Sequence, residues 1–208
     1  GQRPQVNHHP FNAMRKMASN FGWDWGIDAA TVGIWRPVRL EAWRTARLGP
    51  VRVLATADRD HGTTGRTDGD SARGHLEVRA DLAAAPGAPT GPREVSVRLT
   101  GGQTDLTGTA TVPADATTAV VRLEVPDVAL WWPRGYGAQP LYDVEVVLAA
   151  DGAVLDTWRT RPGFRSARLD QIPDDDGTSF TLVVNDRPVW VKGANWIPDD
   201  AFVHRVDR

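Results

Sequence analysis

Apolar and polar residues alternate along most of the chain with the period of two that is typical of half-buried β-strands. Gly, Pro and Asp separate these runs, and Asp151-Gly152 is a typical two-residue hairpin turn. Many short strands at this spacing predict a mainly β fold built around an antiparallel, immunoglobulin-like β-sandwich. The predicted strands cover residues 34–43, 51–56, 75–82, 94–99, 119–125, 141–148 and 153–160.

The pattern changes after Gly163, where a second hairpin is predicted. Its strands cover residues 179–184 and 188–192, and the chain then leaves the strand abruptly at Gly193. Two polar or proline-rich stretches, 61–74 and 83–92, are predicted to be loops, the first of them the most mobile part of the chain. We therefore place boundaries near residues 46 and 163, which gives expected segments 1–46, 47–162 and 163–208.

Composition narrows the class of protein. The 208 residues carry a net charge of -2 and no cysteine. The sequence has no basic patch that would predict nucleic-acid binding, and no apolar run long enough to span a membrane. Without cysteine, a metal site with thiolate ligands cannot form. The lack of cysteine favours a reducing, cytoplasmic location. Both ends read as sequence from inside a domain, so we expect a fragment of a longer protein.

The stretch NFGWDWG, residues 20–26, is the first candidate for chemistry. Trp23 and Trp25 flank Asp24, and glycines allow a sharp turn that presents side chains at a loop. A carboxylate can accept hydrogen bonds from two neighbouring hydroxyls, and an indole can cover the C–H face of a sugar ring. The alternative, which composition alone favours, is a packed aromatic corner in which Asp24 accepts from an indole N–H or caps a turn.

Two further stretches are rich in tryptophan. In VKGANWIPDD, residues 191–200, Asn195 and Trp196 follow a predicted strand, and residues at the carboxyl ends of β/α-barrel strands face the active site. The alternative is a glycine-initiated turn with a buried Trp, which the residues by themselves favour. In LWWPRGYG, residues 130–137, packing at a domain interface is the better interpretation.

Several short motifs that could indicate a metal site, a phosphate-binding loop or catalytic acids do not meet the requirements of such sites. His8-His9 point opposite ways in an extended chain, Asp174–Gly177 lacks a closing glutamate for calcium, and Gly101-Gly102 lacks a phosphate-loop pattern. Neither a metal nor a cofactor is therefore expected. Glycoside hydrolysis usually needs two carboxylic acids. The chain has five glutamates, all in predicted strands and none after an asparagine, and they are Glu41, Glu77, Glu94, Glu124 and Glu145.

Taken together, the motifs resemble glycoside hydrolase family 2, and within it the β-mannosidase branch. GIWRPV and GFR are shared across the wider family, whereas NFGWDWG and KGANWIP are more specific to that branch. The motifs occur in the family's order over most of the chain. They are Pro10-Phe11-Asn12, Arg15-Lys16, NFGWDWG, Gly33–Val38, the stretch Trp131–Tyr142, Gly163-Phe164-Arg165 and Lys192–Pro198.

The resemblance implies an architecture of jelly-roll sugar-binding domain, immunoglobulin-like sandwich and (β/α)8 catalytic barrel. Residues 1–46 would then be the end of the jelly roll, 47–162 the sandwich, and 163–208 the first hairpin and strand of the barrel. By resemblance Asp24 binds hydroxyls of a terminal mannose, Trp23 and Trp25 wall the subsite, and Asn195 and Trp196 lie nearby.

The family's two reactive glutamates belong to later barrel strands, so no catalytic residue is expected in this chain. The resemblance implies that the intact enzyme hydrolyses terminal β-mannosides of mannose-containing oligosaccharides with retention. These 208 residues alone are expected to be inactive without the remainder of the catalytic barrel. Two alternatives stay open, namely a carbohydrate-binding or interaction module of sandwich type, and a family relative that acts on a glucosaminide, glucuronide or galactoside.

Overall fold

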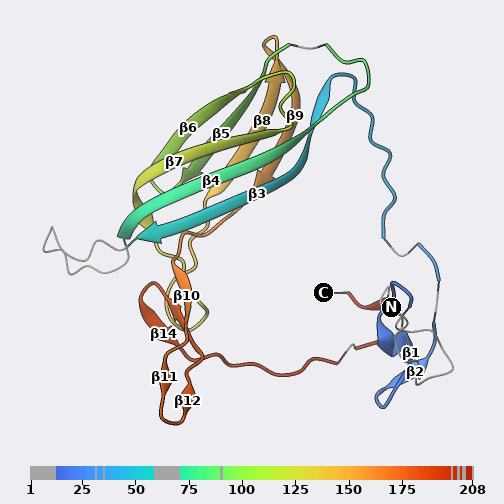
Figure 1. Cartoon of the computed structure of the whole chain (residues 1–208), viewed down its shortest axis with the longest axis vertical. Coiled ribbons are helices and arrows are strands. Elements are labelled where there is room, and N and C mark those ends of the chain that lie inside the picture. Colours follow the sequence, from blue (N-terminus) through green and yellow to red (C-terminus); the bar gives the residue numbers. More distant parts are fainter. Residues whose placement is uncertain are drawn as a thin grey trace, which may run out of the picture. The chain divides into compact units, whose positions relative to one another are not determined.

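The computed structural model of the chain describes residues 13–30, 32–34, 36–58, 71–89, 91–197, 199–200, 202 and 205–207. These residues form β-strands, a three-residue 3-10 turn and connecting segments, and no α-helix occurs among them. The chain divides into two compact units (Figure 1). One is residues 42–191, and the other combines residues 1–41 with 192–208.

The larger unit contains an antiparallel β-sandwich of two sheets (Figure 1). One sheet has the order β3-β4-β7, with β3 Ala46–Asp58, β4 Ser71–Ala84 and β7 Thr118–Ala129. The other has the order β6-β5-β8-β9, with β6 Thr104–Val112, β5 Arg93–Gly101, β8 Asp143–Ala150 and β9 Ala153–Thr160. The predicted mainly β, sandwich-type fold is confirmed.

Because apolar and polar residues alternate along the strands, every second side chain lies between the two sheets. β5 shows the pattern clearly, because Val95, Val97 and Leu99 are almost completely buried while Glu94 and Arg98 are exposed. Each such aliphatic side chain stabilises the fold by roughly 1.5–3 kcal/mol relative to leaving it in water. The same core contains Leu76, Val78 and Ala80 of β4, Val121 and Val125 of β7, and Val144, Val146 and Leu148 of β8.

Close contacts join the two sheets at their sides. The backbone N–H of Leu48 in β3 donates to the Asp156 carboxylate in β9 at 2.9 Å. On the opposite side Gly108 of β6 lies so close to β7 that a Cβ there would come within 2.7 Å of Leu123. β3 also carries Pro50 at a shift in its pairing register. These features protect strand edges that could otherwise pair with other chains.

One predicted strand is wrong, and one strand of the sandwich, β6, was missed. The described residues of 34–43 form no strand, and Ile34, Val38 and Leu40 are 83%, 77% and 100% exposed. Alternation makes a strand only where a partner strand is available, and no described strand pairs with this stretch. β6 was missed because its inward positions include Gly108 and Ala110, whose small side chains weaken the alternation.

Two predicted hairpin turns form. Asp151 and Gly152 adopt φ of 49° and 76° between β8 and β9, and Asn185 and Asp186 adopt 49° and 63°. Positive φ at both central residues is the geometry that matches the twist of paired strands. The second turn joins β13 Thr181–Val184 to β14 Arg187–Val189. β14 therefore ends at Val189, before Lys192, where the predicted strand ends.

A small sheet and a short ribbon follow the sandwich. β10 Ala167–Asp170 completes a three-stranded sheet of order β10-β13-β14, while β11 Pro173–Asp174 and β12 Gly177–Thr178 pair with each other. The acidic stretch Asp174–Gly177, which was rejected as a calcium loop, contains the turn between β11 and β12, where the Asp176 N–H donates to the Asp174 carboxylate at 2.9 Å. The described residues contain no group of three His, Cys, Asp or Glu that could hold a metal ion.

The two adjacent tryptophans pack against neighbouring residues. Trp132 is buried and belongs to the sandwich core. A Cβ at Gly163 would come within 2.8 Å of the Trp131 side chain, so only glycine fits there. The Arg165 guanidinium lies 5.0 Å from the centre of the Trp131 ring. The packing function predicted for this stretch is confirmed, while its place at a boundary between independently folding domains stays a prediction, as does the (β/α)8 part of the fold.

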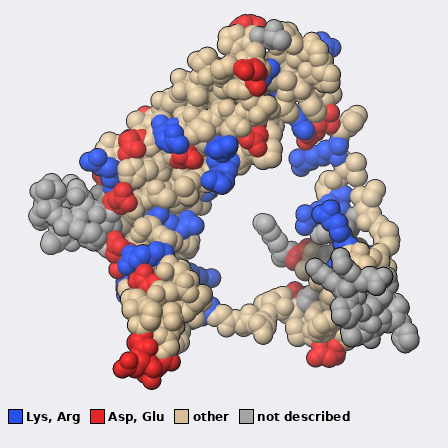
Figure 2. Space-filling view, in the orientation of Figure 1, with Lys and Arg blue, Asp and Glu red and all other residues tan. Residues whose placement is uncertain are grey.

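Positive and negative side chains are interspersed on the visible face of the sandwich (Figure 2). Several charged side chains of the sandwich are paired, as in the bidentate contact of Arg98 with Asp105 at 2.9 and 2.7 Å. This pairing raises the pKa of Arg98 and lowers the pKa of Asp105, chiefly through the hydrogen bonds between them. The visible face therefore lacks the single-sign surface that attracts nucleic acid.

Candidate functional site

The stretch around Asp24 folds as a β-hairpin in the smaller unit. β1 Phe21–Trp23 pairs with β2 Gly26–Asp28, with Trp23 opposite Gly26. Asp24 and Trp25 form the turn that joins the strands. Gly22 has φ of 93°, a backbone conformation that side chains with a Cβ rarely adopt. The glycine therefore shapes the strand that carries Trp23 to the turn.

The hairpin presents its two indoles and its carboxylate to solvent. Trp23 and Trp25 are 55% and 41% exposed, whereas Phe21 is buried and anchors the strand. Asp24 is exposed, and it makes no hydrogen bond or ion pair with any described residue. The aromatic corner with a capped or indole-bonded Asp24 is therefore not the arrangement found.

A short 3-10 turn, η1 Ala18–Asn20, precedes the hairpin and is hydrogen-bonded to the residue that follows the second strand of the hairpin. The Asn20 N–H donates to the Met17 carbonyl at 3.0 Å, and the Asn20 carbonyl accepts from the Ala29 N–H at 3.0 Å. These two bonds fix the backbone of Asn20 at the foot of the hairpin. Its side chain is thereby held beside the strand that follows Trp25.

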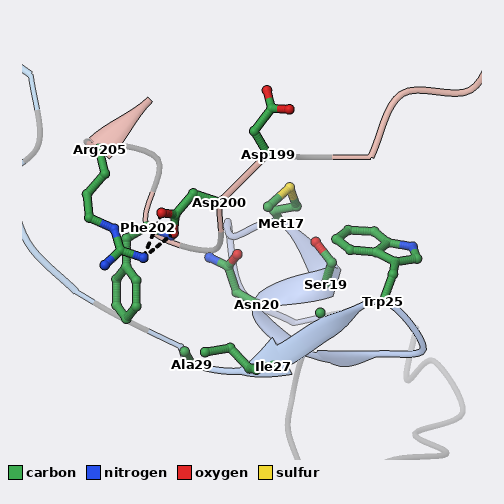
Figure 3. Close-up of a pocket in the computed structure, with 11 residues that line it drawn as sticks. Met17, Ser19, Asn20, Trp25, Ile27, Ala29, Asp199, Asp200, Phe202 and Arg205 are labelled. Atoms are coloured by element: carbon green, nitrogen blue, oxygen red, sulfur yellow. Dashed lines mark hydrogen bonds and ion pairs between the residues drawn. The ribbon is translucent and has the colours of Figure 1, made fainter. Parts of the chain in front are cut away.

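A cavity of about 350 Å³ lies beside the hairpin within the smaller unit (Figure 3). Figure 3 shows the Asn20 side chain directed toward Asp200 and the Trp25 ring standing beside Ser19. The walls combine apolar surface with a few polar groups, which is the composition of small-ligand sites. The residues that line it are Met17, Ser19, Asn20, Trp25, Gly26, Ile27, Ala29, Asp199, Asp200, Phe202 and Arg205.

The second wall of the cavity is organised around Asp200. Its carboxylate accepts from the Phe202 N–H at 2.7 Å and from Nη2 of Arg205 at 2.6 and 2.7 Å. The hydrogen bonds with Asp200 raise the pKa of Arg205. The Arg205 guanidinium also lies 4.7 Å from the centre of the Phe202 ring. Asp200 thus fixes the orientation of a guanidinium and balances its charge.

The structure brings only part of the predicted site together. Trp25 lines the cavity, and Trp23 and Asp24 belong to the same hairpin without lining it. Asn195 and Trp196 are exposed, Trp196 by 81%, and neither lines the cavity.

Sequence reasoning missed the polar groups of the cavity, which are Ser19, Asn20, Asp199, Asp200 and Arg205. Asn20 stands inside the quoted NFGWDWG motif, so its place beside the hairpin could have been inferred. The spacing of Asp200 and Arg205 is compatible with a local ion pair. Nothing in the sequence marks Ser19.

Three of the described glutamates form ion pairs on the surface of the sandwich. Glu77 pairs with Arg122 at 2.8 Å, Glu124 with His75 at 2.7 Å, and Glu145 with Arg159. Glu94 is exposed on β5, and Glu41 is exposed outside any strand, which corrects its expected position. None of these glutamates lines the cavity.

Two family models match the chain. The model of glycosyl hydrolases family 2 matches residues 59–165, and the model of the family's galactose-binding domain-like module matches residues 1–36. The chain belongs to glycosyl hydrolase family 2. Among the described residues of this family 2 chain, no helix is both long and apolar enough to cross a membrane.

Relatives of this family 2 chain include β-mannosidases. It is 34% identical to β-mannosidase B of Thermothelomyces thermophilus over 94% of the chain and 21% of that protein. It is 31% identical to a β-mannosidase of Mus musculus over 94% of the chain and 22% of that protein. The chain therefore spans about a fifth of the length of the curated relatives it matches.

The chain is also similar to solved structures of glycoside hydrolases. The crystal structure of a β-D-mannosidase from Dictyoglomus thermophilum matches 91% of this chain and 22% of its own, with a TM-score of 0.72 and 33% identity. An exo-chitosanase from Amycolatopsis orientalis matches 76% of this chain and 17% of its own, with a TM-score of 0.55 and 20% identity. The second likeness supports the fold alone.

Proposed function

We propose that the chain is part of an exo-acting, retaining β-mannosidase that removes terminal non-reducing β-D-mannose from oligosaccharides. The observation that carries this proposal is the similarity to β-mannosidases over more than nine-tenths of the chain, at 31–34% identity. The exposed hairpin with its free carboxylate supports it, because this arrangement suits a sugar ring.

In this proposal Asp24 is the main sugar ligand that the chain supplies. Its carboxylate is exposed and makes no bond with any described residue, so both oxygens are available to hydroxyl donors. A hydrogen bond to a charged group contributes about 1.5–3 kcal/mol. A site built to bond hydroxyls discriminates strongly, because a sugar without them at the right positions leaves the acid unpaired.

The tryptophans supply the apolar part of the recognition. Trp23 and Trp25 are large, exposed and held on a two-stranded hairpin, so their faces can cover the C–H side of a ring. Asn195 and Trp196 are assigned to the same sugar. They too are exposed, and Asn195 makes no hydrogen bond with a described residue.

The chemical step requires groups outside these residues. A retaining glycosidase uses two carboxylic acids about 5–5.5 Å apart, one as nucleophile and one as acid and base. Glu77, Glu124 and Glu145 are engaged in ion pairs on the sandwich. We therefore assign both reactive acids to the remainder of the catalytic domain, and we expect the 208-residue chain alone not to hydrolyse mannosides.

A panel of nitrophenyl β-glycosides tests this proposal on both the complete gene product and the 208-residue chain. We expect the complete protein to hydrolyse the mannoside, with much lower kcat/KM on the glucosaminide, glucuronide and galactoside, and the chain alone to be inactive. A preference for another glycoside would contradict the substrate assignment. Mannoside binding without turnover by the complete protein would favour the alternative of a sugar-binding module.

A further inference from the structure

Two arginines stand side by side on the outer face of the β3-β4-β7 sheet. Arg52 of β3 and Arg79 of β4 are direct cross-strand partners in the antiparallel register. Both are exposed, whereas Val78 and Ala80, which flank Arg79 along β4, are buried in the core. Directly opposite residues of such a pair have Cβ atoms about 4.5–5.5 Å apart. The register therefore holds two positive side chains at one point of the surface, and Figure 2 shows basic side chains next to each other over β3 and β4.

Neither arginine is balanced by an acidic partner. Arg52 and Arg79 make no hydrogen bond or ion pair with any residue that the structure describes. The next residue across the sheet from Arg79 is Val120, whose side chain is apolar. Like charges that lie directly opposite each other destabilise a sheet. An anion bound between the two guanidinium groups would remove this repulsion.

The acidic side chains on the same face of β4 have other partners. Glu77 lies two residues before Arg79, and its Oε2 accepts from Nε and Nη2 of Arg122, each at 2.8 Å. Asp81 lies two residues after Arg79, and its Oδ1 accepts from the Thr118 hydroxyl at 3.1 Å. The Glu77–Arg122 pair is neutral, and Asp81 offsets only one of the two arginines. The surface around Arg52 and Arg79 therefore keeps a net positive charge.

We propose that Arg52 and Arg79 together bind a tetrahedral oxyanion, the phosphate or sulfate class, between their guanidinium groups. A guanidinium donates two parallel hydrogen bonds to two oxygens of one anion. One arginine therefore occupies both oxygens of a planar carboxylate, whereas a tetrahedral anion has further oxygens for a second arginine. The site belongs to the sandwich and does not rest on the proposed function.

The test is an NMR titration of the ¹⁵N-labelled 208-residue chain with sodium phosphate at constant ionic strength, because salt screens exposed charges. We expect saturable shifts of the Nε–H signals of Arg52 and Arg79, and at least threefold weaker binding of acetate. Methyl phosphate distinguishes the source of the anion. Binding as tight as that of phosphate assigns the site to phosphate groups on larger molecules, and weaker binding assigns it to the free ion; either result supports the arginine pair as the binding groups.

The variants Arg52→Gln and Arg79→Gln should each weaken phosphate binding about twofold to fivefold, as expected for the loss of one exposed ion pair. Arg52→Glu should weaken it more than tenfold and raise the urea midpoint of unfolding, because it places opposite charges across the two strands. Arg134→Gln is the matched control. It removes an exposed arginine from the Pro133–Tyr136 turn with the same change in net charge, and it should leave the affinity unchanged.

Three results would overturn the inference. One is unchanged phosphate affinity in Arg52→Gln and Arg79→Gln variants that retain the parent spectrum. Another is a set of shifts confined to arginines other than these two. The third is equal affinity for acetate and phosphate, which would show that the tetrahedral shape is not read. None of these measurements involves a mannoside, so their outcome is independent of the proposed function.

Discussion

The buried side chain of Asn185 donates from Nδ2 to the backbone carbonyl of Trp131 at 3.0 Å, across 54 residues of sequence. Its Oδ1 accepts from the Ser166 N–H at 3.0 Å, and its own backbone N–H donates to the Ser166 carbonyl at 3.1 Å. One residue in a hairpin turn thus joins the β13–β14 hairpin to two segments of the sandwich unit.

Replacing Asn185 by glycine should lower the free energy of unfolding by about 2–4 kcal/mol. Glycine keeps the positive φ of 49°, so the loss comes from two hydrogen bonds and from the buried backbone groups left without partners. Urea denaturation of the 208-residue chain measures it. Asp186→Gly is the control, because that neighbour also has positive φ and forms an exposed ion pair with Arg168, whose loss should cost less than about 1 kcal/mol.

Gly74 should tolerate no side chain. A Cβ at this position would lie 2.7 Å from Val128 and 3.0 Å from Phe164, both completely buried. Gly74→Ala should therefore lower the unfolding free energy by about 1–3 kcal/mol through overpacking. Gly91→Ala, where no atom lies within 4 Å of the added methyl group, should leave it unchanged or slightly raised. Equal thermal midpoints for the two variants would contradict the described core.

His75 should give the sandwich a small dependence on pH. Its Nδ1 lies 2.7 Å from Glu124 and its Nε2 lies 3.0 Å from Asp58, and the hydrogen bond with Glu124 is the main cause that raises its pKa above 6.5. Because the pKa is higher in the folded state, the stabilisation is fully present below about 6.5. It is lost as the pH rises through the folded-state pKa.

An NMR titration of the imidazole signals of His75 checks this directly, and a midpoint at or below 6.5 would refute it. Unfolding midpoints against pH give the energetic counterpart. The difference between the parent chain and a His75→Gln variant should shrink as the pH rises, and should stay below about 1 kcal/mol because the pairs are exposed.

The alternation of the sequence predicted the sandwich because each strand there finds a partner. β4, β5, β7, β8 and β9 lie where the period-two pattern placed them. The same pattern failed at 34–43, where no described strand pairs with the chain. Residue periodicity reports which face a strand would bury, and it does not report whether a neighbouring strand is present.

The candidate site was predictable only where chemistry is concentrated in one motif. Two tryptophans around Asp24 identified the hairpin, and Trp25 does line the cavity. Ser19 could not be found, because the burial of one hydroxyl depends on how distant segments fold together. The long-range bond of Asn185 was hidden for the same reason, since its sequence context indicates only a turn.

The steady-state kinetics of an Asp24→Asn variant of the complete gene product, with nitrophenyl β-mannoside as substrate, test the central claim most directly. Asp24 is exposed and has no partner among the described residues, so the substitution should leave the fold intact. Asp151→Asn is the matched control, because it makes the same change in a two-residue turn of the sandwich. We predict that Asp24→Asn lowers kcat/KM by about 100-fold, through weakened bonds between the charged acid and the sugar hydroxyls, while Asp151→Asn has no effect. Equal kcat/KM values for the two correctly folded variants would contradict the account.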